Sequence, residues 1–532
     1  MPTLEWIGKE KVVNHHQEVP YRVLERQYSY DEAGQHAGDN GSENMIIHGD
    51  NLEALKALLP RYEGKVKCIY IDPPYNTGNE GWVYNDNVND PKIKKWLGEV
   101  VGKEGEDLSR HDKWLCMMYP RLKLLQKLLA EDGAIFISID STELSSLHLL
   151  CNEIFGNVNF VDYISWFKKA SPSNDAKYFS NDIEYILVFA KNKAIWRPSR
   201  LPLTEKQLRN YQNPDNDPRG CWNSATYTCN KSKEERPSLY YPILNPNTGQ
   251  EVWPKETAVW AYSKEQYEEH IKNNLLYWGV DGKAKYPRFK KFLFGHQGVV
   301  NRTLWHYDDV NHTQGASMEL RKLGITRFDT PKPTRLIERI LQIASTPDSI
   351  ILDSFAGSGT TAHAVLNMNK ADGGHRKFIL VEMMDYAGSI TAERVKRVID
   401  GYGEDKKAVE GAGGQFSYYE LGPVLLLPDG NLNEEVGAQE IREYVYYMET
   451  KEPLPAEQPK DEPYFMGLCR NTAYYFYYER ESVTTLDYAF LSTIQTKAEG
   501  YIIYADLCAI PLETLRNHNI LFKKIPRDIA RL

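Results

Sequence analysis

The chain has 532 residues, more than a single hydrophobic core usually supports, so several domains are expected. With 42% hydrophobic and 26% charged residues the composition is that of a globular protein, and no apolar run approaches the roughly 20 residues of a bilayer span. The N-terminus lacks a secretory pattern, and the seven cysteines form no Cys-x-x-Cys pair. These features favour a cytoplasmic protein and argue against a membrane protein or a structural zinc site.

Positive charge is concentrated in the middle of the chain. The net charge of −9 argues against polyanion binding by the whole surface, because that affinity comes mainly from Lys and Arg. Residues 196–325, however, hold 19 Lys and Arg against 14 Asp and Glu, and six of the eleven tryptophans. Prolines and asparagines are also frequent there. We therefore predict that residues 196–325 form an inserted domain.

The regions around this insert show alternating strand and helix patterns. Residues 1–44 are polar and are predicted to be an arm. The first part of the core, 45–195, is predicted to contain strands at 45–50, 66–72, 134–140 and 182–192 and helices at 51–62, 111–133 and 141–156, the last capped by Ser141.

The same pattern resumes after the insert. The second part of the core, 326–425, is predicted to contain helices at 330–345 and 357–369 and strands at 349–355 and 375–383. Short apolar strands separated by helices predict an α/β fold, a mostly parallel sheet with helices on both faces. The sheet would be interrupted by the insert and completed after it. Residues 426–532 are tyrosine-rich and are predicted to be a C-terminal α+β domain.

The first chemical motif is Asp72-Pro73-Pro74-Tyr75, directly after an apolar strand. Ligands of open α/β sheets bind beyond the carboxyl ends of the strands, so a reaction centre is expected here. Asp72 and the carbonyl of Pro73 can accept hydrogen bonds from an exocyclic amine, and Tyr75 offers a face for stacking on a base. The alternative is a Pro-Pro turn that only closes the strand.

The second motif is a glycine-rich turn between a strand and a helix, Asp353-Ser354-Phe355-Ala356-Gly357-Ser358-Gly359-Thr360-Thr361. Gly357 and Gly359 allow backbone to approach a ligand closely, and the amides that open the helix favour a carboxylate. No Lys follows the second glycine, so the motif is not the phosphate loop of an ATP motor.

Two further carboxylates end predicted strands. Glu382 is expected to bind the ribose hydroxyls of an adenosine-containing cofactor, with a solvated strand end as the alternative. Asp50 is expected to contact the cofactor's adenine, with capping of the following helix as the alternative. Adjacent histidines at 15 and 16 lack accompanying ligands, and no metal site is expected.

Together these motifs resemble those of the DNA amino-methyltransferases. The catalytic motif precedes the cofactor loop with the insert between them, which is the order of the beta class. The runs HGDNLEALKALL and IYIDPPYNTGNEGWVYNDNV resemble, more narrowly, the modification subunits of type III restriction-modification systems. Thr330-Pro331-Lys332-Pro333 resembles the family's segment beside the methionine of the cofactor, which adds Lys332 and Pro333 to the expected cofactor residues.

The resemblance implies S-adenosylmethionine as the cofactor and a Rossmann-like methyltransferase fold. It also implies transfer to N6 of an adenine flipped out of duplex DNA, with the insert recognising the target, and it suggests a homodimer and a restriction (helicase-nuclease) partner. Asp before Pro-Pro-Tyr favours adenine over N4 of cytosine, but the motif alone does not settle this. The alternatives are a solitary DNA methyltransferase, one acting on RNA or on a protein glutamine amide, and a subunit whose main task is to bind DNA for a restriction partner.

Two other sequence runs carry predictions. Five cations interleaved with aromatic residues are predicted to contact DNA, with a solvated charged loop as the alternative: Lys283, Lys285, Arg288, Lys290 and Lys291. The aromatic run 474–478 is predicted to serve sheet formation and assembly rather than DNA binding.

Overall fold

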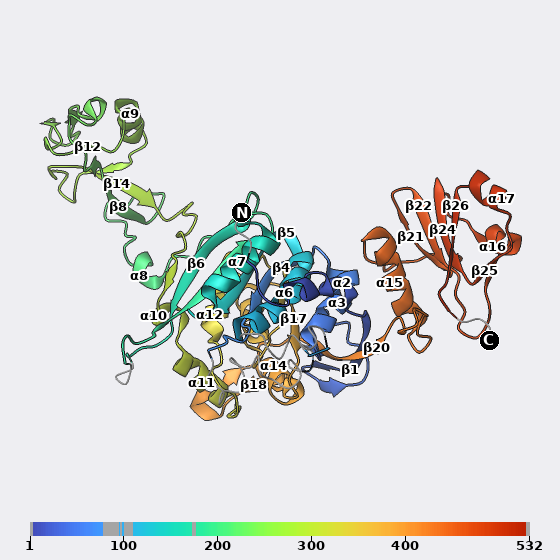
Figure 1. Cartoon of the computed structure of the whole chain (residues 1–532). Helices are drawn as coiled ribbons and strands as arrows, with labels where there is room; N and C mark the ends of the chain where they lie inside the picture. The colour runs from blue at the N-terminus through green and yellow to red at the C-terminus, as the bar shows by residue number, and fades with distance from the viewer. Residues whose placement is uncertain (1–3, 78–94, 96–97, 100–109, 173–176, 528–532) are drawn as a thin grey trace. The chain divides into compact units, whose positions relative to one another are not determined.

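The computed structural model describes residues 4–77, 95, 98–99, 110–172 and 177–527 (Figure 1). Most residues between Tyr75 and Arg110 lie outside these ranges. The chain divides into two compact units, one formed by Met1–Ser199 with Arg302–Leu532 and the other by Arg200–Asn301. The second unit falls inside the predicted insert. No helix in the described ranges has the length and apolar character needed to cross a membrane.

One large sheet organises the first unit (Figure 1). Its six middle strands run parallel, and antiparallel strands flank them on both sides. In spatial order the strands are β15 (Leu304–Trp305), β6 (Phe160–Phe167), β7 (Ile183–Ala190), β5 (Leu129–Ile139), β4 (Val66–Ile71), β16 (Ile350–Asp353), β17 (Lys377–Glu382), β3 (Met45–His48), β20 (Phe416–Val424), β1 (Arg22–Asp31) and β2 (Gly34–His36).

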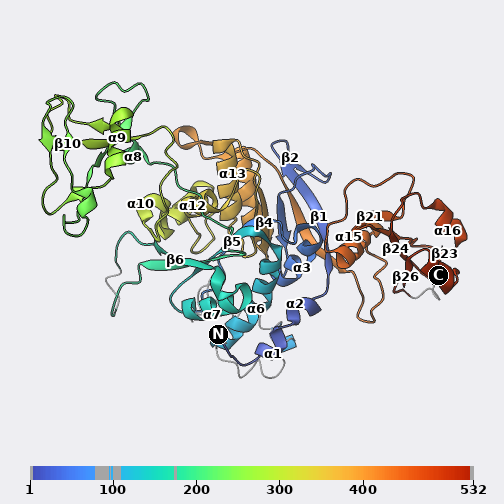
Figure 2. The ribbon, with the colours of Figure 1, turned by 90° about the horizontal axis from the view of Figure 1, so that it is seen from above.

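Helices cover both faces of this sheet, as Figure 2 shows for α6 and α7 on one side and α12 and α13 on the other. Apolar side chains of α3, α6 and α7 form one large core with the sheet. The main helices are α3 (Asn51–Tyr62), α6 (Arg110–Leu128), α7 (Leu144–Phe155), α11 (Thr313–Lys322), α12 (Thr334–Ala344), α13 (Thr360–Asp372) and α14 (Glu393–Asp400). The predicted α/β fold is therefore confirmed.

The two halves of the core meet in the middle of the sheet. Strand β4 pairs with β16 through Cys68–Ile351 and Ile69–Leu352, and β17 pairs with β3 through four residues. Strands that precede the insert are thus direct neighbours of strands that follow it. The sheet is interrupted and later completed, as the element order predicts.

Three local predictions were wrong. Residues 1–44 are not only an arm, because β1 pairs with β20 along most of its length. Ser141 does not cap α7, which begins at Leu144 without a side-chain cap; instead Asp140 accepts the N–H of Thr142 at 2.8 Å and closes a turn. The predicted helix 111–133 ends at Leu128, and β5 begins at the next residue.

The second unit has its own small core, formed by Tyr227, Ile243, Trp260, Leu276 and Trp278. A three-stranded sheet lies beside it in the order β13 (Leu276–Tyr277), β14 (Arg288–Phe292) and β8 (Trp222–Thr226). The remaining elements are short: α8 (Glu205–Leu208), β9 (Thr228–Cys229), β10 (Ile243–Leu244), β11 (Glu251–Val252), β12 (Val259–Trp260) and α9 (Lys264–Lys272).

The C-terminal region contains α15 (Ala438–Thr450) and a four-stranded sheet. In spatial order its strands are β21 (Phe465–Cys469), β22 (Thr472–Phe476), β24 (Gly500–Ala505) and β26 (Ile520–Lys524). The aromatic run 474–478 lies in and just after β22, and four of its five side chains are buried. These four build the core of the region, so the predicted assembly role does not hold for them.

Candidate active site

Carboxylates end three neighbouring strands of the sheet. Asp72 directly follows β4, Asp353 ends β16 and Glu382 ends β17. Because β4, β16 and β17 are parallel neighbours, their carboxyl ends lie at the same edge. This is the edge at which open α/β sheets bind their ligands.

Asp72 is buried and bound by two other side chains. Lys332 Nζ donates to Oδ1 at 2.8 Å and to Oδ2 at 2.7 Å, and the Tyr75 hydroxyl lies 2.8 Å from Oδ1. Lys332 precedes α12 and is 260 residues away in sequence. Lys332, expected beside the cofactor, therefore also binds the predicted catalytic carboxylate.

A second buried carboxylate joins this group. Glu184 in β7 accepts from Lys168 Nζ at 2.8 Å, lies 3.6 Å from Lys332 Nζ and is 3.1 Å from the Tyr75 hydroxyl. Burial alone would raise the pKa of Glu184, but Lys332 and Lys168 bring it below its usual value. Burial also raises the pKa of Asp72, and Lys332 opposes that shift. Two carboxylates and two ammonium groups thus alternate in one cluster.

The catalytic motif is fixed on both sides. The Pro74 carbonyl accepts from Trp114 Nε1 at 2.6 Å, and Asn76, in the left-handed region at φ 59°, donates to Glu143 Oε1 at 2.5 Å. The Tyr75 ring is buried, with Lys332 Nζ 5.0 Å from its centroid. The ring is therefore enclosed by protein. The role of the Pro73 carbonyl stays a prediction.

The side chains of Glu382 and Thr391 form hydrogen bonds with the glycine loop, residues 353–361. Gly357 donates its N–H to Glu382 Oε2 at 2.8 Å, and its carbonyl accepts from Thr391 Oγ1 at 2.6 Å. Gly359 has φ 80°, and a Cβ there would lie 3.0 Å from the Thr391 carbonyl oxygen. Glycine is needed at Gly359 because its backbone is left-handed and closely packed.

A cavity joins the two motifs. It is lined by Asp72 and Lys332 together with most of the predicted cofactor residues: Asp353, Phe355, Ala356, Gly357, Ser358 and Thr360. Tyr70, Phe328, Thr330, Pro331 and Thr361 complete its wall. The structure therefore brings the expected catalytic carboxylate and the expected cofactor loop into one space.

Four predicted residues lie around this cavity rather than on its wall. Asp50 caps α3 by accepting the N–H of Leu52 at 2.8 Å, which is the alternative role considered for it. Pro333 is the N-cap residue of α12, and Gly359 is that of α13. Glu382 lies behind the loop, where burial raises its pKa to about 7.

A buried arginine that the sequence did not reveal supports the cavity wall. Arg394 in α14 donates to Ser358 Oγ at 2.9 Å and to Thr360 Oγ1 at 2.8 Å. Burial lowers its pKa to about 10, so it remains a cation at neutral pH. Thr360 Oγ1 in turn donates to the Lys332 carbonyl at 3.2 Å, so it is the Ser358 hydroxyl, together with the Arg394 charge, that biases this wall toward an anionic ligand.

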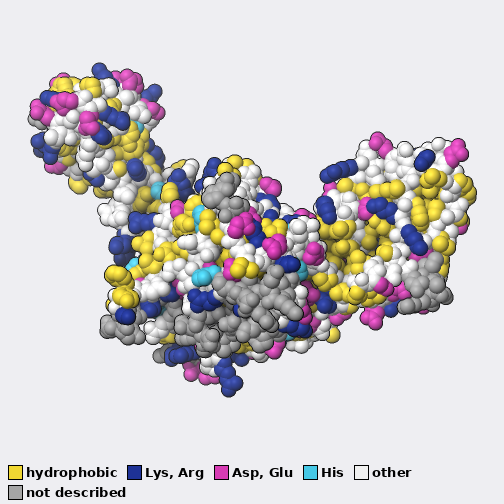
Figure 3. Space-filling model, viewed as in Figure 1, with side chains coloured by type: hydrophobic (Ala, Val, Ile, Leu, Met, Phe, Trp, Pro, Cys, Tyr) yellow, Lys and Arg dark blue, Asp and Glu magenta, His cyan; other side chains and the backbone are white. Residues whose placement is uncertain are grey.

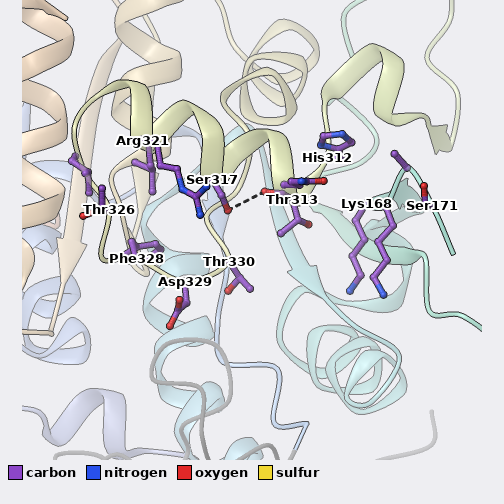
Figure 4. A pocket seen from close by; sticks show the side chains of 15 residues that line it. Lys168, Ser171, His312, Thr313, Ser317, Arg321, Thr326, Phe328, Asp329 and Thr330 are labelled. Carbon is purple, nitrogen blue, oxygen red and sulfur yellow. Dashed lines mark hydrogen bonds between the residues drawn. The ribbon is translucent and has the colours of Figure 1, made fainter. Parts of the chain in front are cut away.

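A larger cavity of about 540 Å³ adjoins the first one, and the two share Phe328 and Thr330 (Figure 4). Basic side chains line it from two places: Lys168 and Lys169 follow β6, while His312 caps the start of α11 and Arg321 lies in the last turn of that helix. Lys168 therefore links this cavity to Glu184. Lys168, Lys169 and Arg321 outnumber Asp329 in the lining, and this net positive charge suits an anionic group.

The five cations of the predicted DNA strip do not share one environment. Lys283, Lys285 and Lys291 are exposed, while Arg288 is half-buried and donates to Ser224 Oγ at 2.7 Å. The visible face of the second unit carries basic and acidic side chains intermixed (Figure 3). Of the five, three lysines are therefore exposed, Arg288 is partly exposed, and Lys290 alone is buried.

Lys290 corrects the prediction. Its side chain is 1% exposed and forms ion pairs with Asp215 at 2.5 Å and Asp217 at 2.9 Å. A buried, doubly paired ammonium group cannot reach phosphate. Lys290 therefore stabilises the second unit from within, and it does not belong to a DNA-contacting strip.

Replacing Lys290 with Met is expected to lower the free energy of unfolding by about 2 kcal/mol, because Asp217 keeps its contact with Arg219 but loses the buried ammonium group. Denaturant unfolding followed by tryptophan fluorescence measures this. The matched control is Lys291→Met on the neighbouring, exposed position, with an expected change within about 0.5 kcal/mol. Equal losses in both variants would contradict the assignment of Lys290 to the interior.

Comparisons with known proteins identify the family of this chain. The family model described as DNA methylase matches residues 66–393, which include both motifs. The StyLTI Mod subunit, a type III restriction-modification enzyme of Salmonella typhimurium, is 38% identical over 361 residues, covering 65% of this chain and 53% of the relative. The EcoPI Mod subunit of Escherichia phage P1 is 33% identical over 417 residues, covering 71% and 63%.

A type II methyltransferase, M.KpnI of Klebsiella pneumoniae, is 32% identical over 370 residues, covering 65% of this chain and 81% of the relative. The chain spans between half and two thirds of the length of the two Mod subunits. The resemblance predicted from the motifs is confirmed. The chain belongs to the DNA methylase family.

Proposed function

We propose that this protein is a site-specific DNA methyltransferase that moves a methyl group from S-adenosylmethionine to N6 of an adenine flipped out of duplex DNA. The observation that carries the proposal is the shared cavity, in which Asp72 and the glycine loop face the same space. A methyl donor on the loop would therefore lie beside the carboxylate that binds the amine.

The cavity has the donor set that S-adenosylmethionine requires. Gly357 lines the cavity and lets the backbone approach a ligand closely, and the hydroxyl of Ser358, whose oxygen accepts from Arg394, suits the carboxylate of the methionine part. Asp353, whose pKa burial raises to about 7, is the acid on the same wall. Bound there, the cofactor supplies an electrophilic methyl group.

One hydrogen-bond acceptor position of Asp72 remains for an amine. A carboxylate offers about four acceptor positions. Tyr75 and the two Lys332 contacts take three of them, which leaves one on Oδ2. An exocyclic amine is a poor nucleophile because its lone pair is delocalised into the ring. A hydrogen bond to Asp72 orients the amine toward the methyl group and provides an acceptor for the proton that nitrogen loses.

The target nucleotide needs a path to Asp72. The adjoining cavity of about 540 Å³ meets the cofactor cavity at Phe328 and Thr330, and Lys168, Lys169 and Arg321 lie along it. We infer that the extruded nucleotide enters here, with its phosphates near the basic side chains. Stacking of Tyr75 on the base stays a prediction, since the hydroxyl of this residue is held between Asp72 and Glu184.

The relatives of this chain support a proposal about the system to which it belongs. Those with 38% and 33% identity are named Mod subunits of type III enzymes, and we propose that this chain is the modification and recognition subunit of such a system. Its partners would be duplex DNA, a second copy and a restriction subunit. The relative named as a type II methyltransferase keeps a solitary enzyme as the second candidate.

A transfer assay tests this proposal. Purified protein with methyl-labelled S-adenosylmethionine is expected to label unmethylated duplex DNA, and to leave RNA and bulk protein unlabelled under the same conditions. Label in RNA or in glutamine amides instead would overturn it. Addition of a helicase-nuclease subunit, with cleavage of unmethylated DNA as the readout, separates the type III assignment from a solitary enzyme.

The exposed lysines of the second unit give a prediction about DNA binding. Changing Lys283, Lys285 and Lys291 to Ala together is expected to weaken binding and reduce the salt slope of log Kd by roughly 0.9 for each phosphate that these lysines neutralise. The control removes three other exposed lysines of the same unit: Lys255, Lys264 and Lys272. If both triple variants show the same slope, a local strip is contradicted.

A further inference from the structure

The cluster around Asp72 contains a carboxylate to which neither sequence motif assigns a task. Glu184 is the second residue of β7, which is otherwise apolar and aromatic, and it is 7% exposed. Removing a carboxylate from water is costly unless it is paired. Its partners are Lys168, Lys332 and Tyr75, so it binds both side chains that bind Asp72.

We propose that Glu184 is a positioning residue for methyl transfer: it holds Lys332 and Tyr75 against Asp72, and Lys168 in turn holds Glu184. This inference rests on the proposed function. Glu184 does not itself touch the substrate, and it acts through the side chains that orient the catalytic carboxylate.

The contacts that Lys332 and Tyr75 make with Asp72 and Glu184 support this role of Glu184. Two of the three Lys332 N–H bonds are used by Asp72, and the ion pair to Glu184 at 3.6 Å holds the remaining side of the ammonium group. The Tyr75 hydroxyl has one proton and lies between the two carboxylates, 2.8 Å from Asp72 and 3.1 Å from Glu184. Both partners of Asp72 are therefore held from two sides.

Lys168 fixes the far end of the cluster. It follows β6, donates to Glu184 Oε1 at 2.8 Å, and lines the cavity proposed for the extruded nucleotide. Positive and negative side chains alternate along the cluster in the order Lys168, Glu184, Lys332 and Asp72. Their charges sum to zero. Without the Glu184 charge, two ammonium groups lie beside one carboxylate, which makes Asp72 a weaker acceptor.

The charges around Asp72 determine the direction in which the pH dependence of activity shifts when the Glu184 charge is removed. The groups that face Asp72 are Tyr70 of its own strand, Glu184 of β7, Asp353 of β16, and Lys332 and Tyr75. Glu184 contributes to raising the pKa of Asp72. Since Asp72 acts as the ionised acceptor, activity is lost as pH falls through its pKa. Removing the Glu184 charge lowers that pKa and moves the acid limb to lower pH.

The experiment compares the full-length protein with Glu184→Gln. We expect kcat at saturating DNA and cofactor to fall at least tenfold, and the acid limb of the kcat profile to move to lower pH. The Kd for S-adenosylmethionine, measured by calorimetry, should stay within about twofold. The control is Glu462→Gln, which removes another buried carboxylate in the C-terminal region and should leave all three quantities unchanged.

A folded Glu184→Gln protein with parental kcat and an unmoved acid limb would overturn the inference. If that variant does not fold, Lys168→Gln decides, because Lys168 is at the edge of the cluster with 17% of its side chain exposed. A fall in kcat at saturating DNA supports the inference, and an unchanged kcat overturns it. Failure of the proposed function is distinct, since the parental protein would then transfer no methyl group to DNA.

Discussion

Replacing Asp72 with Asn is expected to reduce kcat for methyl transfer roughly 10²–10³-fold, the loss typical of removing one aligned electrostatic contact from a transition state. The asparagine side chain has the same size but lacks the negative charge that draws the amine proton. Lys332 now donates to both carboxylate oxygens of Asp72, and in the variant one of these acceptors is replaced by an amide NH₂ group, which is itself a donor. Single-turnover transfer with excess enzyme measures the chemical step without product release.

Cofactor affinity should be unchanged in this variant, because the glycine loop, Asp353 and Arg394 are intact. The matched variant Asp72→Glu keeps the charge but extends the side chain by one methylene, and it should also lose activity because the carboxylate is displaced. Normal turnover in Asp72→Asn would remove Asp72 from the chemistry. A parallel loss of cofactor binding would show instead that the site had collapsed.

Replacing Lys332 with Met is expected to lower kcat at neutral pH by roughly 10²-fold, because Asp72 loses the partner that orients it. Lys332 opposes the burial that raises the pKa of Asp72, so its removal raises that pKa further. The acid limb of the kcat profile should therefore move to higher pH, opposite to the shift expected for Glu184→Gln. The pH profiles of the two variants, measured in the same buffers, provide the comparison.

The control is Lys332→Arg, which keeps the charge and should restore the acid limb toward its parental position. The sequence predicts Lys332 beside the cofactor, and it does line that cavity. A rise in the Kd for S-adenosylmethionine with no change in the acid limb would support a cofactor contact alone. It would contradict the assignment of Lys332 to Asp72.

Local patterns predicted much of the core correctly. The boundaries of α3 agree to the residue, since a capping Asp50 and a regular apolar face define that helix. Both motifs lie where strand-to-loop order predicts, at the carboxyl ends of β4 and β16. The strand β1 was missed because its residues are mostly polar and partly exposed, and because its partner β20 lies about 390 residues further along.

The cluster around Asp72 could not be predicted in the same way. Its members come from three distant segments, and only the strand order places Glu184 and Lys332 beside Asp72. One signal was available: a charged residue within the apolar run of β7 requires a partner. The error at Lys290 was avoidable, because successive side chains of a strand face opposite sides. Lys290 and Lys291 are neighbours in β14, so they cannot both face DNA.

Mass spectrometry of nucleosides tests whether Asp72 directs methyl transfer to adenine: unmethylated genomic DNA is incubated with methyl-labelled S-adenosylmethionine and either the parental or the Asp72→Asn protein. We expect labelled N6-methyladenine from the parental protein and very little from the variant. Labelled N4-methylcytosine would contradict the choice of base while leaving the role of Asp72 in place. Equal labelling by both proteins would contradict the role of Asp72 itself.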